Sequence, residues 1–198
     1  MSDQQKVDKT RRNLVVATSA VGAAAGVGVA VPFVASMTPS EKAKAAGAPI
    51  EVDLTKIAPG DMGTFEWRGK PVWVIHRTKE MIESLKAAAP RLTDPESKSS
   101  KQPTYAKNEV RSENPEWMVM EGVCTHLGCS PKLKPADDKA EMGTDWVGGF
   151  YCPCHGSKFD LAGRVYRGSP APTNLVVPPY TLAEGKLVVG EDKENKGA

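Results

Sequence analysis

Two short stretches of this 198-residue chain constrain its fold more than any other feature. They read Cys-Thr-His-Leu-Gly-Cys at residues 124–129 (box 1) and Cys-Pro-Cys-His-Gly-Ser at residues 152–157 (box 2). Together they contain all four cysteines and two of the three histidines. Thiolate sulfur and neutral imidazole nitrogen bind zinc or iron, and each box offers both kinds of ligand. The sequence therefore predicts two loops that form the halves of one metal site.

The number of cysteines in the boxes exceeds what a simple site needs. Box 1 contains a Cys-x-His pair and box 2 a Cys-x-x-His pair, which leaves Cys129 and Cys154 over. A mononuclear zinc site takes four ligands and gives no reason for a further cysteine in each loop. A structural zinc site, or a pair of disulfides with incidental histidines, is the alternative interpretation.

The two boxes resemble the two-part signature of the Rieske 2Fe-2S proteins of cytochrome bc complexes. This resemblance implies one 2Fe-2S cluster with two thiolate and two imidazole ligands. The implied ligands are Cys124 and Cys152 on the buried iron, and His126 and His155 on the outer iron. Two neutral imidazoles leave the oxidised cluster neutral, whereas four thiolates would leave it doubly negative. Such a cluster accepts an electron more easily, at potentials of about −150 to +300 mV.

The same resemblance assigns roles to residues around the cluster. Cys129 and Cys154 are implied to form a disulfide that joins the loops. Leu127 is implied to be exposed beside the cluster, with simple packing as the alternative, and Ser157 to donate a hydrogen bond to a bridging sulfide. The stretch Gly168-Ser169-Pro170-Ala171-Pro172 resembles the proline-rich loop that covers the cluster as a third wall. An ordinary turn between strands is the alternative for this stretch.

The N-terminal region predicts a membrane anchor. Residues 1–13 are polar and contain Arg11-Arg12, which resembles the bacterial twin-arginine export signal. The uncharged run at residues 14–37 is about 36 Å long as a helix, enough to cross the hydrocarbon core with tilt. Its length favours a retained anchor over a cleaved signal sequence. The positive residues before it predict a cytoplasmic N-terminus in the bacterial inner membrane and a periplasmic C-terminal domain, where a disulfide can form.

The rest of the chain predicts a flexible neck and a mainly β domain. Residues 38–49 are small and polar without apolar periodicity, which is typical of a linker. The domain is expected at residues 50–191 and a frayed tail at residues 192–198. The resemblance implies that the domain is a Rieske-type antiparallel β sandwich. It also implies a small cluster-binding β subdomain at about residues 122–172, with both boxes at hairpin tips.

Local patterns place the elements of this domain. Strands are expected at residues 50–54, 64–67, 72–75, 117–120, 146–151, 176–177, 180–182 and 187–189. A helix is expected between a cap at Thr78 and Pro90. Residues 90–115 have little periodicity and predict a surface excursion outside the core. His76 ends a predicted strand and is expected to be a surface or edge residue.

The resemblance implies the Rieske subunit of a quinol to cytochrome c oxidoreductase. Its implied partners are a cytochrome b subunit, a c-type cytochrome subunit, quinol and membrane lipid, in a dimeric complex that contributes to a proton gradient. His155, with His126 as the alternative, is implied to bind quinol and to receive its proton together with an electron. The net charge of +2 and the few aromatic residues give no indication of nucleic-acid binding.

Two other functions fit parts of the pattern. One is the small Rieske subunit of an exported molybdenum oxidase of the arsenite oxidase kind, which also uses a twin-arginine signal. The other is a zinc-stabilised binding module without a redox role. Co-purification with haem or molybdopterin, and metal analysis, distinguish these possibilities.

Phe159 departs from the family pattern and generates a prediction. Many bc-type members have a tyrosine at this position, whose hydroxyl donates to the sulfur of the first cysteine ligand, here Cys124. A phenyl ring cannot donate this bond. We therefore expect Phe159→Tyr to raise the midpoint potential of the cluster, since a donor to sulfur stabilises the more negative, reduced form. A redox titration measures this, and an unchanged or lower potential would contradict it.

Overall fold

The structure is a computed structural model, and it describes residues 8–191 without the side chains of Lys42 and Ala46. The chain forms two compact units, of which the first ends at Lys44 and the second begins at Ala45. The expected tail at residues 192–198 lies outside the described residues.

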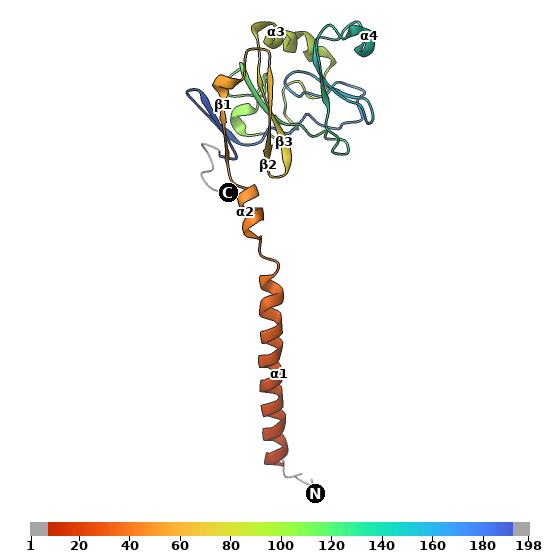
Figure 1. Cartoon of the computed structure of the whole chain (residues 1–198). Coiled ribbons are helices and arrows are strands. Elements are labelled where there is room, and N and C mark those ends of the chain that lie inside the picture. Colours follow the sequence, from red (N-terminus) through yellow and green to blue (C-terminus); the bar gives the residue numbers. More distant parts are fainter. Residues whose placement is uncertain (1–7, 192–198) are drawn as a thin grey trace. The chain divides into compact units, whose positions relative to one another are not determined.

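The first unit contains the helix α1 (Lys9–Ala35), which is drawn as one long ribbon in Figure 1. The carboxylate of Asp8 caps it by accepting hydrogen bonds from the backbone N–H groups of Thr10 and Arg11. This cap explains why the helix begins five residues before the expected start at residue 14. Among the described residues, α1 is the one helix long and apolar enough to cross a membrane, a test that signal sequences also pass.

The expected neck at residues 38–49 contains a short helix, α2 (Glu41–Ala46). The hydroxyl of Ser40 accepts a hydrogen bond from the backbone N–H of Ala43, so a local cap supports this helix. The division between the two units falls inside α2.

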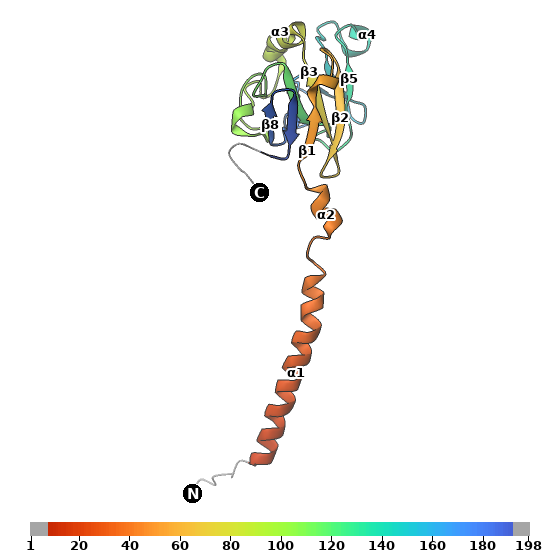
Figure 2. The same cartoon turned by 60° about the vertical axis from the view of Figure 1, so that its left-hand side comes forward.

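The second unit is mainly β, as predicted, and contains three antiparallel three-stranded sheets (Figures 1 and 2). The first sheet has the order β1 (Ile50–Asp53), β9 (Lys186–Val189), β8 (Tyr180–Ala183). The second has the order β2 (Met62–Trp67), β3 (Lys70–His76), β4 (Trp117–Glu121). The third has the order β5 (Lys132–Lys134), β6 (Gly149–Cys152), β7 (Ser157–Phe159).

Short helices connect the strands of the second unit. They are η1 (Leu54–Lys56), α3 (Lys79–Ala88), η2 (Ala89–Arg91), η3 (Thr104–Ala106) and α4 (Lys139–Met142). The predicted cap of α3 is confirmed, because the hydroxyl of Thr78 accepts a hydrogen bond from the backbone N–H of Met81. This helix buries Leu85 and Ala88.

One sequence-based expectation about the second unit is wrong and another is incomplete. Residues 176–177 form no strand; instead the carbonyl of Val176 accepts a hydrogen bond from the backbone N–H of Glu121. Residues 90–115 are mostly exposed or half-buried, as expected of a surface excursion, but five of them are buried in the interior. These are Leu92, Ser97, Ala106, Arg111 and Ser112. Several are polar and are buried because hydrogen bonds compensate them, which hydrophobic periodicity does not reveal.

Trp73 connects the second and third sheets through the core. Its indole ring on β3 stacks on the ring of Phe150 on β6, with a centroid separation of 4.8 Å and an interplanar angle of 15°. Gly122, which follows β4 just before box 1, faces this indole closely. A Cβ atom on Gly122 would lie 2.3 Å from Cε2 of Trp73. The close contact with the Trp73 indole therefore fixes the position of the backbone just before box 1.

We expect Gly122→Ala to destabilise the second unit by about 1–3 kcal/mol, because the added methyl group overlaps the indole ring of Trp73. Urea unfolding of the purified protein measures this free energy. The matched control is the same substitution in a Trp73→Leu background, where the smaller side chain removes the overlap. An equal cost of Gly122→Ala in both backgrounds would contradict this explanation.

Candidate metal centre

Box 2 is the turn of the β6–β7 hairpin. Cys152 ends β6 and pairs with Ser157, the first residue of β7. Gly156 closes the turn by donating its backbone N–H to the carbonyl of Cys152 at 2.9 Å. Its φ of +78° is a conformation that side chains disfavour, which explains a glycine at this position. The hairpin exposes Cys154 and His155 at its tip and keeps Cys152 buried.

Box 1 follows β4 and continues toward β5, so it connects the second and third sheets. It is not a hairpin tip, and the expectation for the two boxes is thus right for box 2 alone. Two backbone hydrogen bonds close the loop: Cys124 N–H donates to the carbonyl of Cys129 at 2.7 Å, and Gly128 N–H donates to the carbonyl of Cys124 at 3.0 Å. This compact loop brings its histidine next to box 2.

The structure gathers the cysteines and histidines of the two boxes in one place. A disulfide joins Cys129 to Cys154, as the resemblance implied. The sulfur atoms of these two residues and of Cys152 all lie within 4.8 Å of one another. The rings of His126 and His155 lie edge to face, with their centroids 4.8 Å apart. The two boxes therefore form one site.

The free cysteines of the site are Cys124 and Cys152, and each is only 2% exposed. Burial raises the pKa of the Cys124 thiol; the neighbouring Cys152 thiol raises it further, while the His126 backbone N–H and the Ser157 hydroxyl act in the opposite direction. A raised pKa disfavours the thiolate that a nucleophilic cysteine needs. A metal ligand also has to lose this proton, so metal binding at Cys124 would displace the thiol proton.

The two histidines complete a donor set that fits a Rieske cluster. Nδ1 of His126 is buried and has no hydrogen-bond partner among the described residues. An unsatisfied buried nitrogen is costly, and a bond to metal would satisfy it. His155 is exposed, and Leu127 beside the histidines is 71% exposed. Two sulfur donors thus lie inside and two imidazoles lie toward solvent, the combination that holds a 2Fe-2S cluster of this class.

Residues 165–174 contain the stretch Gly168–Pro172 that resembles the proline-rich loop, and we use that name for the whole segment from here on. The segment is hydrogen-bonded to both boxes. Oγ1 of Thr125 in box 1 donates to the carbonyl of Thr173 at 2.7 Å. Oγ of Ser157 in box 2 accepts from the backbone N–H of Ala171 at 3.0 Å. Next to box 2, the backbone N–H of Lys158 donates to Oγ of Ser169 at 3.1 Å. Within this loop, Gly168 and Pro170 are exposed.

The remaining residues singled out by the sequence have defined positions. Oγ of Ser157 is buried and interacts with the Cys124 thiol, and its bond to a sulfide stays a prediction. Phe159 is fully buried on β7, opposite Phe150 on β6, and its effect on the potential also stays a prediction. His76 ends β3 and stacks on Trp117, with Nδ1 2.9 Å from the carbonyl of Ile57.

Sequence reasoning missed the residues that hold the loops from behind. Asp160 and Arg164 form a fully buried ion pair just after box 2. Their spacing of four residues inside an apolar stretch was a signal that could have indicated this pair. Arg111 and Asn174 are also buried beside the loops, and no pattern in the sequence indicated their contacts.

Two family models match parts of this chain. A family model described as Ubiquitinol-cytochrome C reductase Fe-S subunit TAT signal matches residues 1–40. A second model, described as Rieske 2Fe-2S domain, matches residues 103–181.

Similar proteins include two bacterial relatives, each named Ubiquinol-cytochrome c reductase iron-sulfur subunit. The relative from Allochromatium vinosum is 52% identical over 96% of this chain and 92% of its own length. The relative from Blastochloris viridis is 44% identical over 96% of this chain and 98% of its own length. A solved structure of a Hyperthermophilic respiratory Complex III is 30% identical, with a TM-score of 0.49, over 87% of this chain and 98% of that one.

We expect Thr125→Val to destabilise the cluster-loaded protein by about 1–3 kcal/mol, because it removes the donor to the Thr173 carbonyl while keeping the side-chain volume. The thermal midpoint for loss of the cluster's visible absorption measures the effect. Thr125→Ser keeps the hydroxyl and is the matched control. A midpoint that falls equally for both substitutions would contradict a role for this hydrogen bond.

Proposed function

This chain belongs to the family of ubiquinol-cytochrome c reductase iron-sulfur subunits, and from this premise we propose that it is an electron-transfer subunit. It would take electrons from quinol at the outer side of a cytochrome b subunit and pass them to a c-type cytochrome subunit. Its cofactor is a Rieske 2Fe-2S cluster. The names of the relatives favour this function over that of a molybdenum-oxidase subunit.

The observation that carries the proposal is the pairing of two buried free thiols with two adjacent imidazoles on the solvent side. Cys124 and Cys152 would hold the inner iron, and His126 and His155 the outer iron. When bound, the cluster supplies an acceptor for one electron at a time. The disulfide between the remaining cysteines of the boxes keeps the two ligand-bearing loops together.

His155 is the residue of this chain that would meet quinol. Its imidazole is exposed at the tip of the β6–β7 hairpin, so a quinol hydroxyl can reach it. There it would accept a hydrogen bond from that hydroxyl and hold the proton that quinol loses on oxidation. Leu127, which is 71% exposed, would offer an apolar contact for the quinol ring.

The partners follow from the same proposal. Cytochrome b and the c-type cytochrome would lie beside this subunit in a dimeric membrane complex, and quinol and lipid would be its small-molecule partners. We propose that α1 is retained as a single membrane span, with a cytoplasmic N-terminus and the second unit in the bacterial periplasm. The neck at residues 38–49 would let the second unit reach both partners in turn. Electron delivery in this direction contributes to the proton gradient.

We expect His155→Asn to abolish the native Rieske signal in electron paramagnetic resonance and to abolish quinol-dependent reduction of the c-type cytochrome. The physical reason is that an amide does not replace an imidazole as an iron ligand and does not hold the quinol proton. Membrane insertion should persist, because α1 is unchanged.

The matched control is His76→Asn, which changes the histidine outside the boxes and should retain both the signal and turnover. Normal turnover with His155→Asn would refute the assignment of this residue.

A further inference from the structure

We propose that Asn174 is a positioning residue that closes the base of the proline-rich loop (residues 165–174) and thereby fixes this loop against the two boxes for quinol binding. The first part of this inference concerns the fold alone. The second part rests on the proposed function.

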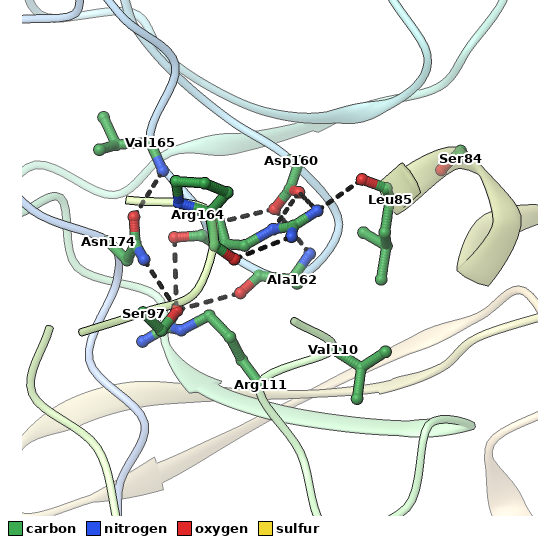
Figure 3. Close-up of polar contacts among 12 residues, drawn as sticks. Ser84, Leu85, Ser97, Val110, Arg111, Asp160, Ala162, Arg164, Val165 and Asn174 are labelled. Atoms are coloured by element: carbon green, nitrogen blue, oxygen red, sulfur yellow. Dashed lines mark hydrogen bonds and ion pairs between the residues drawn. The ribbon is translucent and has the colours of Figure 1, made fainter. Parts of the chain in front are cut away.

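Asn174 bonds to two segments at once. Its side chain is only 1% exposed. Oδ1 accepts the backbone N–H of Val165 at 2.9 Å. Nδ2 donates at 3.0 Å to Oγ of Ser97, as Figure 3 shows, and at the same distance to the carbonyl of Asp94. The orientation of the amide is fixed, because the Val165 N–H needs an acceptor and the Asp94 carbonyl needs a donor.

The bond to Val165 closes the loop. Val165 and Asn174 are the first and last residues of the segment, so this one side chain joins its two ends. Beside it, Leu175 N–H donates to the carbonyl of Gly163 at 2.8 Å, which continues the closure in the backbone. Thr173, the neighbour of Asn174, is the residue whose carbonyl receives the hydrogen bond from Thr125 in box 1. A shift of Asn174 is therefore passed directly to the contact between the loop and the cluster site.

Residues 94–100, which accept the hydrogen bonds of Nδ2 of Asn174, are themselves held by several hydrogen bonds. The carboxylate of Asp94 accepts hydrogen bonds from the backbone N–H groups of Lys98 and Ser99 and from the hydroxyl of Ser100. Arg164, paired with Asp160, donates to the carbonyl of Pro95. These bonds hold residues 94–100 in one conformation. Asn174 thus ties the proline-rich loop to a turn that is itself tied to the residues after box 2.

Arg111 fixes the chain on the far side of Asn174. Its guanidinium is fully buried and donates to the carbonyl of Leu175 at 2.6 Å and to that of Ala162 at 3.0 Å. The backbone after Asn174 is therefore held independently of its side chain. Loss of that side chain should open the loop between residues 165 and 174 without unfolding the sheets.

Hydrogen exchange of the full-length, cluster-loaded protein tests the closure. Asn174→Ala leaves the buried Val165 N–H without an acceptor. We expect exchange at residues 165–174 to become about tenfold faster or more, while exchange in β2, β3 and β4 stays unchanged. Unchanged exchange at residues 165–174, or an equal increase throughout the second unit, would overturn the proposal.

Two further measurements keep the test decisive. Ser97→Ala is the matched control, because it removes one partner of Nδ2 and leaves the closing bond of Oδ1 intact; it should leave exchange at residues 165–174 unchanged.

If Asn174→Ala does not fold, hydrogen exchange of the unmodified protein still tests whether the loop is closed. The Val165 amide should then exchange as slowly as the amides of β6. Exchange at the rate of an exposed loop amide would overturn the closure.

Kinetics of the assembled complex test the positioning role. We expect Asn174→Ala to raise KM for quinol about tenfold and to change kcat by less than about twofold, with Ser97→Ala unchanged in both. Faster exchange at residues 165–174 with an unchanged KM would overturn the link to quinol binding. Absence of quinol oxidation by the unmodified complex would instead contradict the proposed function and leave the result on loop closure standing.

Discussion

The metal site depends on contact between two loops that come from different sheets. Box 1 extends from the second sheet and box 2 is the turn of the third, so nothing in either sheet alone aligns them. Three connections at different depths do so. The disulfide joins the boxes directly, the Trp73–Phe150 stack joins the sheets beneath them, and the proline-rich loop bonds to both. Without this alignment the two thiols and two imidazoles would not converge.

Buried charge holds the region behind the boxes. Arg77, Arg111 and Arg164 are each at most 2% exposed and donate to backbone carbonyls from several segments. Burial lowers the pKa of Arg77 and of Arg111 to about 10, so both stay charged at neutral pH. The hydrogen bonds and the Asp160 carboxylate offset the cost of removing these charges from water. A rearrangement that breaks one of these hydrogen bonds leaves a buried guanidinium without its partner. The hydrogen bonds of the three arginines therefore favour one arrangement of the loops.

The sequence predicted the parts of the protein that short-range patterns determine. The spacing of cysteines and histidines indicated one site, alternation located most strands, and Thr78 indicated the start of α3. The resemblance added the Cys129–Cys154 pairing. The burial of Ser97, Arg111 and Ser112 was missed, because the polar residues of this region are buried through hydrogen bonds to residues far away in the sequence. The link from box 1 to the third sheet was missed for the same reason, since strand pairing is not encoded locally.

Two thiols and two imidazoles converge in the boxes, and this donor set predicts a cluster of high potential. Low-temperature electron paramagnetic resonance of the purified full-length protein, first with ascorbate and then with dithionite, measures this property. We expect a Rieske-type signal already with ascorbate, because two neutral imidazoles keep the oxidised cluster uncharged and easily reduced. A signal that requires dithionite, or a silent protein that contains zinc, would contradict it.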